Sequence, residues 1–227
     1  MRINDDFSCR ASVTFAEDAF VPSPMAGVER LMLDRIGDEV ARATSLVRFA
    51  PGSAFSAHTH GGGEEFLVLE GVFQDETGDY PAGSYVRNPP TSRHTPRSAP
   101  GCVIFVKLWQ FDPDDRAGVT VTPDADAFAP VDGEAGTTRM PLYADPHEMV
   151  ALERWAPDTT VTRTVRGGTE ILVVDGTLIE GGETLTAWSW LRLPPGASLS
   201  AKAGPQGCRL WIKTGHLTAV SAPRDAA

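Results

Sequence analysis

The feature that most constrains the fold of this chain is an internal repeat with a period of about 106 residues. Residues 46–71 (LVRFAPGSAFSAHTHGGGEEFLVLEG) are echoed by residues 152–176 (LERWAPDTTVTRTVRGGTEILVVDG), and GCVIFVKLW (101–109) is echoed by GCRLWIKTG (207–215). A period of this length indicates a duplicated domain and not a solenoid. The repeat predicts two tandem domains, residues 1–112 and 138–227, joined by a linker at 113–137 that is rich in Asp, Gly, Ala and Pro.

Both copies are expected to consist of β-strands. Apolar runs are short, rich in Val, Ile, Phe and Trp, and bounded by turn-forming residues, a pattern typical of an all-β sandwich or barrel. The chain has 22 glycines and 18 prolines, against about 27 of the two together at average usage. The predicted strands are 44–49, 65–69, 84–86, 103–109, 149–155, 171–174, 187–193 and 209–212.

Charge and composition exclude several classes of protein. The net charge of −10 argues against a nucleic-acid partner, because phosphate binding needs a basic surface. No apolar run approaches the length of a membrane span, and residues 1–15 lack the apolar core of a secretory signal. The three cysteines form no CxxC motif and suit a reducing compartment. We therefore expect a cytoplasmic protein without a membrane or nucleic-acid partner.

Ligands suited to a metal ion are concentrated in the first copy. His58, His60 and Glu64 lie at even spacings, so on a strand their side chains would share one face. His94 follows a turn-rich stretch and could complete the set from an antiparallel neighbour. Three imidazoles and one carboxylate suit a single divalent transition metal such as Fe(II), Zn, Mn or Ni.

These residues carry a resemblance to a known family. The segment Gly52-SAFSA-His58-Thr-His60-GGG-Glu64-EFLVLE-Gly71 resembles the first cupin motif, and Gly83-SYVRNPPTSR-His94 resembles the second. The longer string is similar to the ChrR-type cupins, found as the sensory domain of ChrR anti-sigma factors and in related dioxygenase-like proteins. The resemblance implies two tandem cupin barrels (double-stranded β-helix, or jelly roll) and a homodimer. Thr91 stands where the second motif has Gly, and Ser98 where it has Asn.

The second copy serves as an internal comparison for the proposed ligands. Aligned on the first copy, it places Thr164, Arg166 and Thr169 at the positions of His58, His60 and Glu64. The position of His94 falls on Leu199 or Ser200. We therefore expect the second barrel to be degenerate and to bind no metal.

Residues that both copies keep are expected to be structural. Glu65 matches Glu170, which favours Glu64 over Glu65 as the ligand. Cys102 matches Cys208, and Lys107 matches Lys213; the cysteines are interpreted as small core residues. Tyr85 and Arg87, on the strand before His94, are candidates to border the pocket, with a plain strand-face role as the alternative.

A divalent ion with three neutral imidazoles and one carboxylate has a net charge of about +1, which favours an anionic oxygen donor. The first hypothesis is a non-heme metal-dependent dioxygenase acting on a small oxygenated substrate such as a diketone or hydroxy-ketone. The second is a sensory or regulatory cupin (transcription regulation, oxidative-stress sensing) without a sigma-binding module of its own. The third is a bicupin whose metal is structural.

Overall fold

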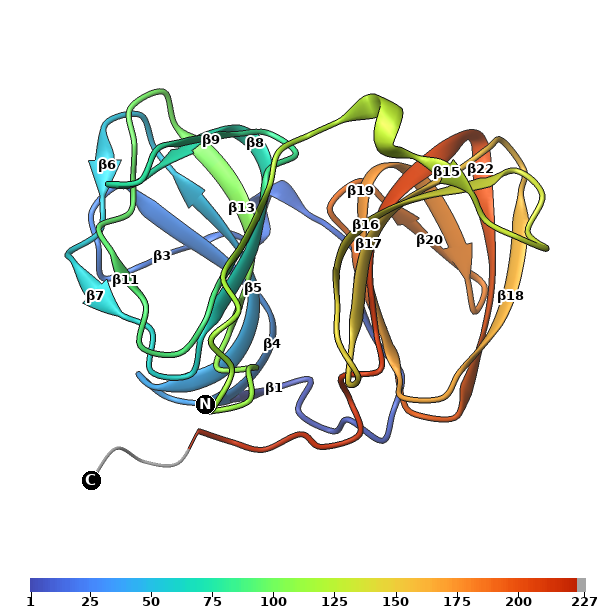
Figure 1. Ribbon diagram of the computed structural model, residues 1–227, viewed down its shortest axis with the longest axis horizontal. Helices are drawn as coiled ribbons and strands as arrows, with labels where there is room; N and C mark the ends of the chain where they lie inside the picture. The colour runs from blue at the N-terminus through green and yellow to red at the C-terminus, as the bar shows by residue number, and fades with distance from the viewer. Residues whose placement is uncertain (224–227) are drawn as a thin grey trace. The chain divides into compact units, whose positions relative to one another are not determined.

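The computed structural model describes residues 1–223, which form β-strands and turns without an α-helix in that range (Figure 1). Two 3₁₀ turns are present, η1 (Glu17–Ala19) and η2 (Ala125–Ala127). Each of the predicted strands coincides with or overlaps an observed one, so the all-β prediction is confirmed. Among the described residues, no helix has the length and apolar character needed to cross a membrane.

The chain divides into two compact units. Unit 1 comprises residues 1–5, 18–123 and the described residues from Ser221 on; unit 2 comprises residues 6–17 and 124–220. Each unit is a barrel of antiparallel strands (Figure 1). The prediction of two tandem cupin-type barrels is confirmed at the level of the fold.

The large sheet of unit 1 has the strand order β1-β4-β5-β13-β8-β10-β14, and short strands β6, β9 and β12 extend it while β7 and β11 pair separately. The strands are β1 (Arg2–Ile3), β3 (Val21–Pro22), β4 (Val28–Gly37), β5 (Ala41–Phe49), β6 (Ser53–Ala54), β7 (His58–Thr59), β8 (Glu64–Gln74), β9 (Asp79–Pro81), β10 (Tyr85–Asn88), β11 (Arg93–His94), β12 (Arg97–Ser98), β13 (Cys102–Leu108) and β14 (Val119–Val121).

Unit 2 repeats this arrangement in the order β15-β16-β17-β22-β19-β21-β2. Its strands are β2 (Ala11–Val13), β15 (Ala129–Pro130), β16 (Thr137–Ala144), β17 (Met149–Trp155), β18 (Thr160–Val165), β19 (Thr169–Glu180), β20 (Glu183–Thr186), β21 (Trp190–Leu193) and β22 (Ala197–Thr214). The long strand β22 pairs with β18 through its first part and with β17 through its second. It therefore spans the region that β11, β12 and β13 share in unit 1.

The residues kept by both copies occupy matched places in the sheets. Cys102 lies opposite Phe49 and Gly71, as Cys208 lies opposite Trp155 and Gly176. Both thiols are buried, and burial raises the pKa of Cys102 to about 11 and that of Cys208 to about 12. These cysteines are core residues, as the comparison of the copies indicated.

The matched glycines of the two copies have a steric cause. Gly71 has φ +71°, and a Cβ at this position would lie 2.0 Å from the carbonyl oxygen of Gly101. Gly176 repeats the arrangement, with φ +77° and 2.2 Å to the carbonyl oxygen of Gly207. No other residue fits so close a backbone approach, so glycine is required where β8 and β19 bend.

The division of the chain differs from the predicted boundaries at 112 and 138. Residues 6–17 belong to unit 2, because β2 adds to the edge of β21 with Ala11 opposite Arg192. The predicted linker is also divided, since its first part supplies β14 to unit 1 and its second supplies β15 to unit 2. These three strands are two or three residues long and lack a strong apolar pattern, so no sequence signal predicts their pairings.

Candidate metal centre

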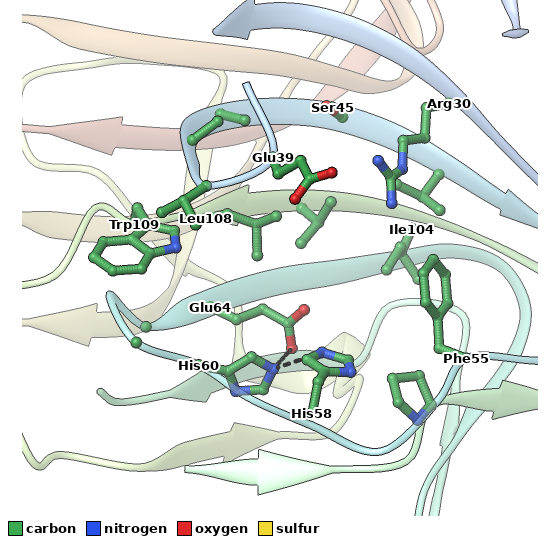
Figure 2. Close-up of a pocket in the computed structure, with 18 of the residues that line it drawn as sticks. Arg30, Glu39, Ser45, Phe55, His58, His60, Glu64, Ile104, Leu108 and Trp109 are labelled. Carbon is green, nitrogen blue, oxygen red and sulfur yellow. Dashed lines mark hydrogen bonds and ion pairs between the residues drawn. The ribbon is translucent and has the colours of Figure 1, made fainter. Parts of the chain in front are cut away.

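Four side chains of unit 1 converge inside its barrel: those of His58, His60, Glu64 and His94 (Figure 2 shows the first three). His58 lies on β7 and His94 on β11, and the antiparallel pairing of these strands sets the two residues directly opposite each other. His60 follows β7 and Glu64 begins β8. The four residues come together through the pairing of β7 with β11 and the turn between β7 and β8, and not through alternation along one strand as the even spacing suggested.

The potential ligand atoms of this cluster lie within 4.8 Å of one another. The Nε2 atom of His60 is 3.2 Å from Nε2 of His58 and 3.4 Å from Oε2 of Glu64. The Nε2 atom of His94 is also 3.4 Å from Oε2 of Glu64. Three imidazole nitrogens and a carboxylate oxygen thus face one small volume, the ligand set of a divalent transition metal.

The opposite nitrogen of each ring is held by a second contact. The Nδ1 atom of His58 lies 3.0 Å from the Ser56 carbonyl oxygen, and that of His94 lies 3.2 Å from Oδ2 of Asp75. Both partners accept hydrogen bonds only, so Nδ1 carries the proton and Nε2 keeps its lone pair. His60 makes the equivalent contact, 2.9 Å, with the Ser92 hydroxyl.

The hydrogen bonding of the cluster fits a metal ion at its centre. Nε2 of His94 is buried and has no hydrogen-bond partner among the described residues. An unpartnered buried acceptor is costly unless something else satisfies it. A cation between the three rings and Glu64 would do so, which makes this set of residues one that could hold a metal ion.

Burial sets the charge of these groups. Burial lowers the pKa of His60 to about 4, and the nearby His58 lowers it further. Burial also lowers the pKa of His94, although the negative charge of Glu64 acts in the opposite direction. Burial also raises the pKa of Glu64, opposed by His94 and by the 3.1 Å hydrogen bond that Asn88 donates. His60 and His94 are therefore neutral near pH 7, the form in which imidazole binds metals.

The cluster opens into a cavity of about 310 Å³ inside unit 1. The wall is largely apolar and comes from alternate residues of β5 and β13, whose inward side chains are Val47, Phe49, Ile104, Val106 and Leu108. Among the lining residues that are only partly buried or exposed, the rim is formed by Arg30, Arg35, Glu39, Phe55 and Trp109. All of them except Arg35 are labelled in Figure 2. His58 is exposed while the other three members of the cluster are buried, so the cluster is reached from its His58 side.

Tyr85 and Arg87 do not line this cavity, which corrects the prediction that they border the pocket. Side chains alternate along β10, and the inward positions are those of Val86 and Asn88. On the other face, Tyr85 donates a 2.8 Å hydrogen bond to Glu65, and Arg87 forms a 2.7 Å ion pair with Asp115. Their role is in the strand face, the alternative left open by the sequence.

Three supporting residues escaped the sequence analysis: Asp75, Ser92 and Asn88, which contact His94, His60 and Glu64 respectively. Asp75 belongs to the turn after β8, where it accepts hydrogen bonds from Thr77. The sequence Asp-Glu-Thr-Gly indicates such a turn. It does not indicate that the Asp75 carboxylate contacts His94, 19 residues further along the chain. Asn88, two residues after an inward Val, could have been found from strand alternation.

Unit 2 lacks the cluster of histidines and glutamate. The structure also corrects which residues of unit 2 correspond to His58 and His60. His94 lies opposite His58 in unit 1, and Leu199 lies opposite Arg163 in unit 2. The position of His58 is therefore taken by Arg163 and that of His60 by Val165, not by Thr164 and Arg166. The one-residue offset begins before these positions, where the sequence offers no identity to place it.

In unit 2 apolar side chains and an ion-paired arginine occupy the positions that correspond to the cluster of unit 1. Val165 and Leu199 join its apolar core. Arg163 forms ion pairs with Glu134 and with the buried Glu153, 2.9 Å away. An arginine paired with two carboxylates occupies the position where unit 1 presents an imidazole.

The fold and the donor set of unit 1 define a cupin. Residues 8–112 match the model of the ChrR cupin-like domain family, to which the sequence motifs are similar. None of the curated proteins matches the sequence.

Solved structures share the fold at low sequence identity. A protein from Nostoc punctiforme, provisionally assigned as a dioxygenase, is 14% identical with a TM-score of 0.66 over 100% of this chain and 87% of its own. A cupin 2 conserved barrel domain protein from Leptotrichia buccalis is 12% identical with a TM-score of 0.59 over 90% and 95%. A salicylate 1,2-dioxygenase from Pseudaminobacter salicylatoxidans is 14% identical with a TM-score of 0.57 over 76% and 70%.

Proposed function

We propose that the protein is a metal-dependent dioxygenase that cleaves a C–C bond in a small oxygenated substrate. The observation that carries the proposal is the convergence of three imidazoles and Glu64 at one side of a largely apolar cavity. Similarity to dioxygenases of the same fold supports it. Only unit 1 would be catalytic, with unit 2 as a degenerate copy.

The residues of unit 1 would have two roles, binding of the metal ion and orientation of its histidine ligands. His58, His60, Glu64 and His94 would hold one divalent ion, which when bound supplies a Lewis acid for an anionic oxygen and, as Fe(II), a centre for O₂ chemistry. Asp75 and the Ser56 carbonyl hold the rings of His94 and His58 in the required tautomer.

The cavity would contribute orientation and exclusion of water. Its apolar wall of Val47, Ile104 and Val106 favours the carbon skeleton of a small molecule, and it removes water from the face of the substrate turned away from the metal. A volume of about 310 Å³ is at the lower end of the range for small-molecule sites.

The test is oxygen consumption by the iron-loaded protein. Protein reconstituted with Fe(II) under anaerobic conditions is mixed with a panel of diketones, hydroxy-ketones and oxo acids in an oxygen electrode, and products are identified by mass spectrometry. Incorporation of both atoms of ¹⁸O₂ into the cleaved products is expected. No uptake with any substrate or metal would exclude the proposal.

The match to the ChrR cupin-like domain favours a second candidate, a sensory or regulatory cupin. In that case the metal site would bind a ligand or oxidant and a separate protein would receive the signal. Affinity purification with metal-loaded and with metal-free protein distinguishes this candidate from the dioxygenase. A sensor is expected to capture a regulatory protein in only one of the two forms.

A further inference from the structure

Arg30 faces the interior of unit 1 from the edge of the cavity wall. It lies on β4 opposite Val47, which lies opposite Ile104 on β13. Directly opposed residues in an antiparallel sheet share a face, and both Val47 and Ile104 belong to the apolar core. A guanidinium group therefore stands in a row of otherwise apolar inward side chains.

A second arginine is turned to the same face by a bulge. The register of β4 against β5 shifts between Met32 and Asp34, so that Arg35 lies opposite Ala43. Without the extra residue, alternation would have sent Arg35 to the other face. Its Nε atom donates to the carbonyl oxygen of Gly37, 3.2 Å away, which holds the side chain beside the hairpin.

Arg30 has no comparable anchor. Among residues 1–223 the Arg30 guanidinium forms no hydrogen bond or ion pair, and its guanidinium carbon lies 5.8 Å from the centre of the Phe55 ring. Glu39 lines the same rim but makes no ion pair with Arg30 or Arg35. Burial, followed by the proximity of Arg35, lowers the pKa of Arg30.

A partly buried arginine without a partner lacks compensation for its lost hydration. A ligand carboxylate would provide it through two parallel hydrogen bonds. Figure 2 shows the Arg30 guanidinium directed into the cavity, on the side away from His58 and Glu64. A bound molecule could thus place a carboxylate at Arg30 and another oxygen near the histidines.

We propose that the cavity takes a small oxo- or hydroxy-carboxylic acid whose carboxylate is bound by Arg30. This deepens the proposed function and rests on it for the identity of the site as a substrate site. It narrows the substrate class, because a neutral diketone would leave Arg30 unpaired in the complex.

Matched pairs of ligands test the proposal by binding. Acetoacetate, 4-oxopentanoate and 5-oxohexanoate each replace one methyl ketone of pentane-2,4-dione, hexane-2,5-dione and heptane-2,6-dione by a carboxylate. Calorimetric titration of the wild-type protein is expected to give at least one acid a tenfold or greater preference over its diketone. The preference should be present in both Zn-loaded and chelator-treated protein, because Arg30 is not a metal ligand.

Substitutions assign the preference to Arg30. Arg30→Gln should reduce it to less than threefold, while unchanged diketone affinity in this variant shows that the cavity is intact. Arg30→Lys should retain part of it, and Arg97→Gln, on the exposed part of β12 in the same unit, should leave it unchanged.

Two results would overturn the proposal: no acid preferred in wild-type protein, or a preference that survives Arg30→Gln. Either can be told apart from failure of the dioxygenase proposal, which shows as absence of oxygen uptake whatever the ligand preference.

Discussion

The carboxylate of Asp75 lies 3.2 Å from Nδ1 of His94 and accepts a hydrogen bond from it, while the other ring nitrogen, Nε2, faces Glu64. Asp75 is buried and is itself fixed by the turn that Thr77 completes. This contact links a turn on the surface of the barrel to the geometry of the cluster inside it.

Asp75→Asn should weaken metal binding by roughly 10- to 100-fold, because an amide can no longer orient and polarise the imidazole as a carboxylate does. Competition with a chromogenic chelator measures the affinity. Asp79→Asn is the control, since Asp79 lies close by on β9 and hydrogen-bonds only Gln74 in the described structure. Equal affinities in the two variants would contradict a supporting role for Asp75.

His60→Ala should abolish stoichiometric metal binding, because it removes one of the four converging side chains proposed to hold the ion. Arg166→Ala, an exposed change in unit 2, should leave it unchanged. Metal content by mass spectrometry after gel filtration measures both, at an expected one metal per chain in the control. One metal retained in His60→Ala would exclude the assignment of His60 as a ligand.

Thr91→Gly should raise the free energy of unfolding by about 1 kcal/mol. Thr91 has φ +75°, a conformation that strains a β-branched residue. Gly196, its counterpart in unit 2, has φ +82° with open space where a Cβ would lie. Gly196→Ala should therefore destabilise by a similar amount. Chemical denaturation measures both, and changes of the same sign would contradict this account.

The metal-free protein should lose stability as the pH falls from 6.5 to about 4 through the titration of His60. The pKa of His60 is about 4 in the folded state against 6.5 as the ordinary value, so the unfolded chain takes up the proton first. Stability from this group is complete above pH 6.5 and decreases below it. The pH dependence of unfolding should be weaker in His60→Gln, and identical slopes in the two proteins would count against the burial effect.

Native protein should show one rapidly reacting thiol out of three. Cys9 is exposed, whereas Cys102 and Cys208 are buried. With pKa values of about 11 and about 12, the buried thiols are ionised to about one part in a thousand or less at pH 8. Titration with a chromogenic disulfide should give one fast equivalent, absent in Cys9→Ser, and three after unfolding. Two or three fast equivalents in native protein would contradict the burial of these cysteines.

The sequence was most informative where a pattern repeats or alternates. The echo of Cys102 in Cys208 predicted matched strands, and the spacing of His58, His60 and Glu64 predicted one cluster. The first prediction depends on the internal repeat and the second on a short motif, and both can be recognised in the sequence without knowledge of tertiary contacts.

The features that sequence reasoning missed depend on tertiary contacts. The bulge that turns Arg35 inward follows from how β4 packs on β5. The contact of Asp75 with His94 joins a turn to a strand without a spacing rule. For Tyr85 and Arg87 the sequence left a pocket role and a strand-face role open, because the register of β10 against β8 decides which alternate residues face the core.

The inclusion of residues 6–17 in unit 2 has a consequence for folding during synthesis. Strand β2 leaves the ribosome well before its partner β21, which begins only at Trp190. The pairing of Ala11 with Arg192 is among the most distant in the chain, and contacts of this kind form slowly. The barrel translated second thus depends on a strand translated first, and an excised fragment starting at Asp124 would present the edge of β21 uncovered, an edge open to association with other chains.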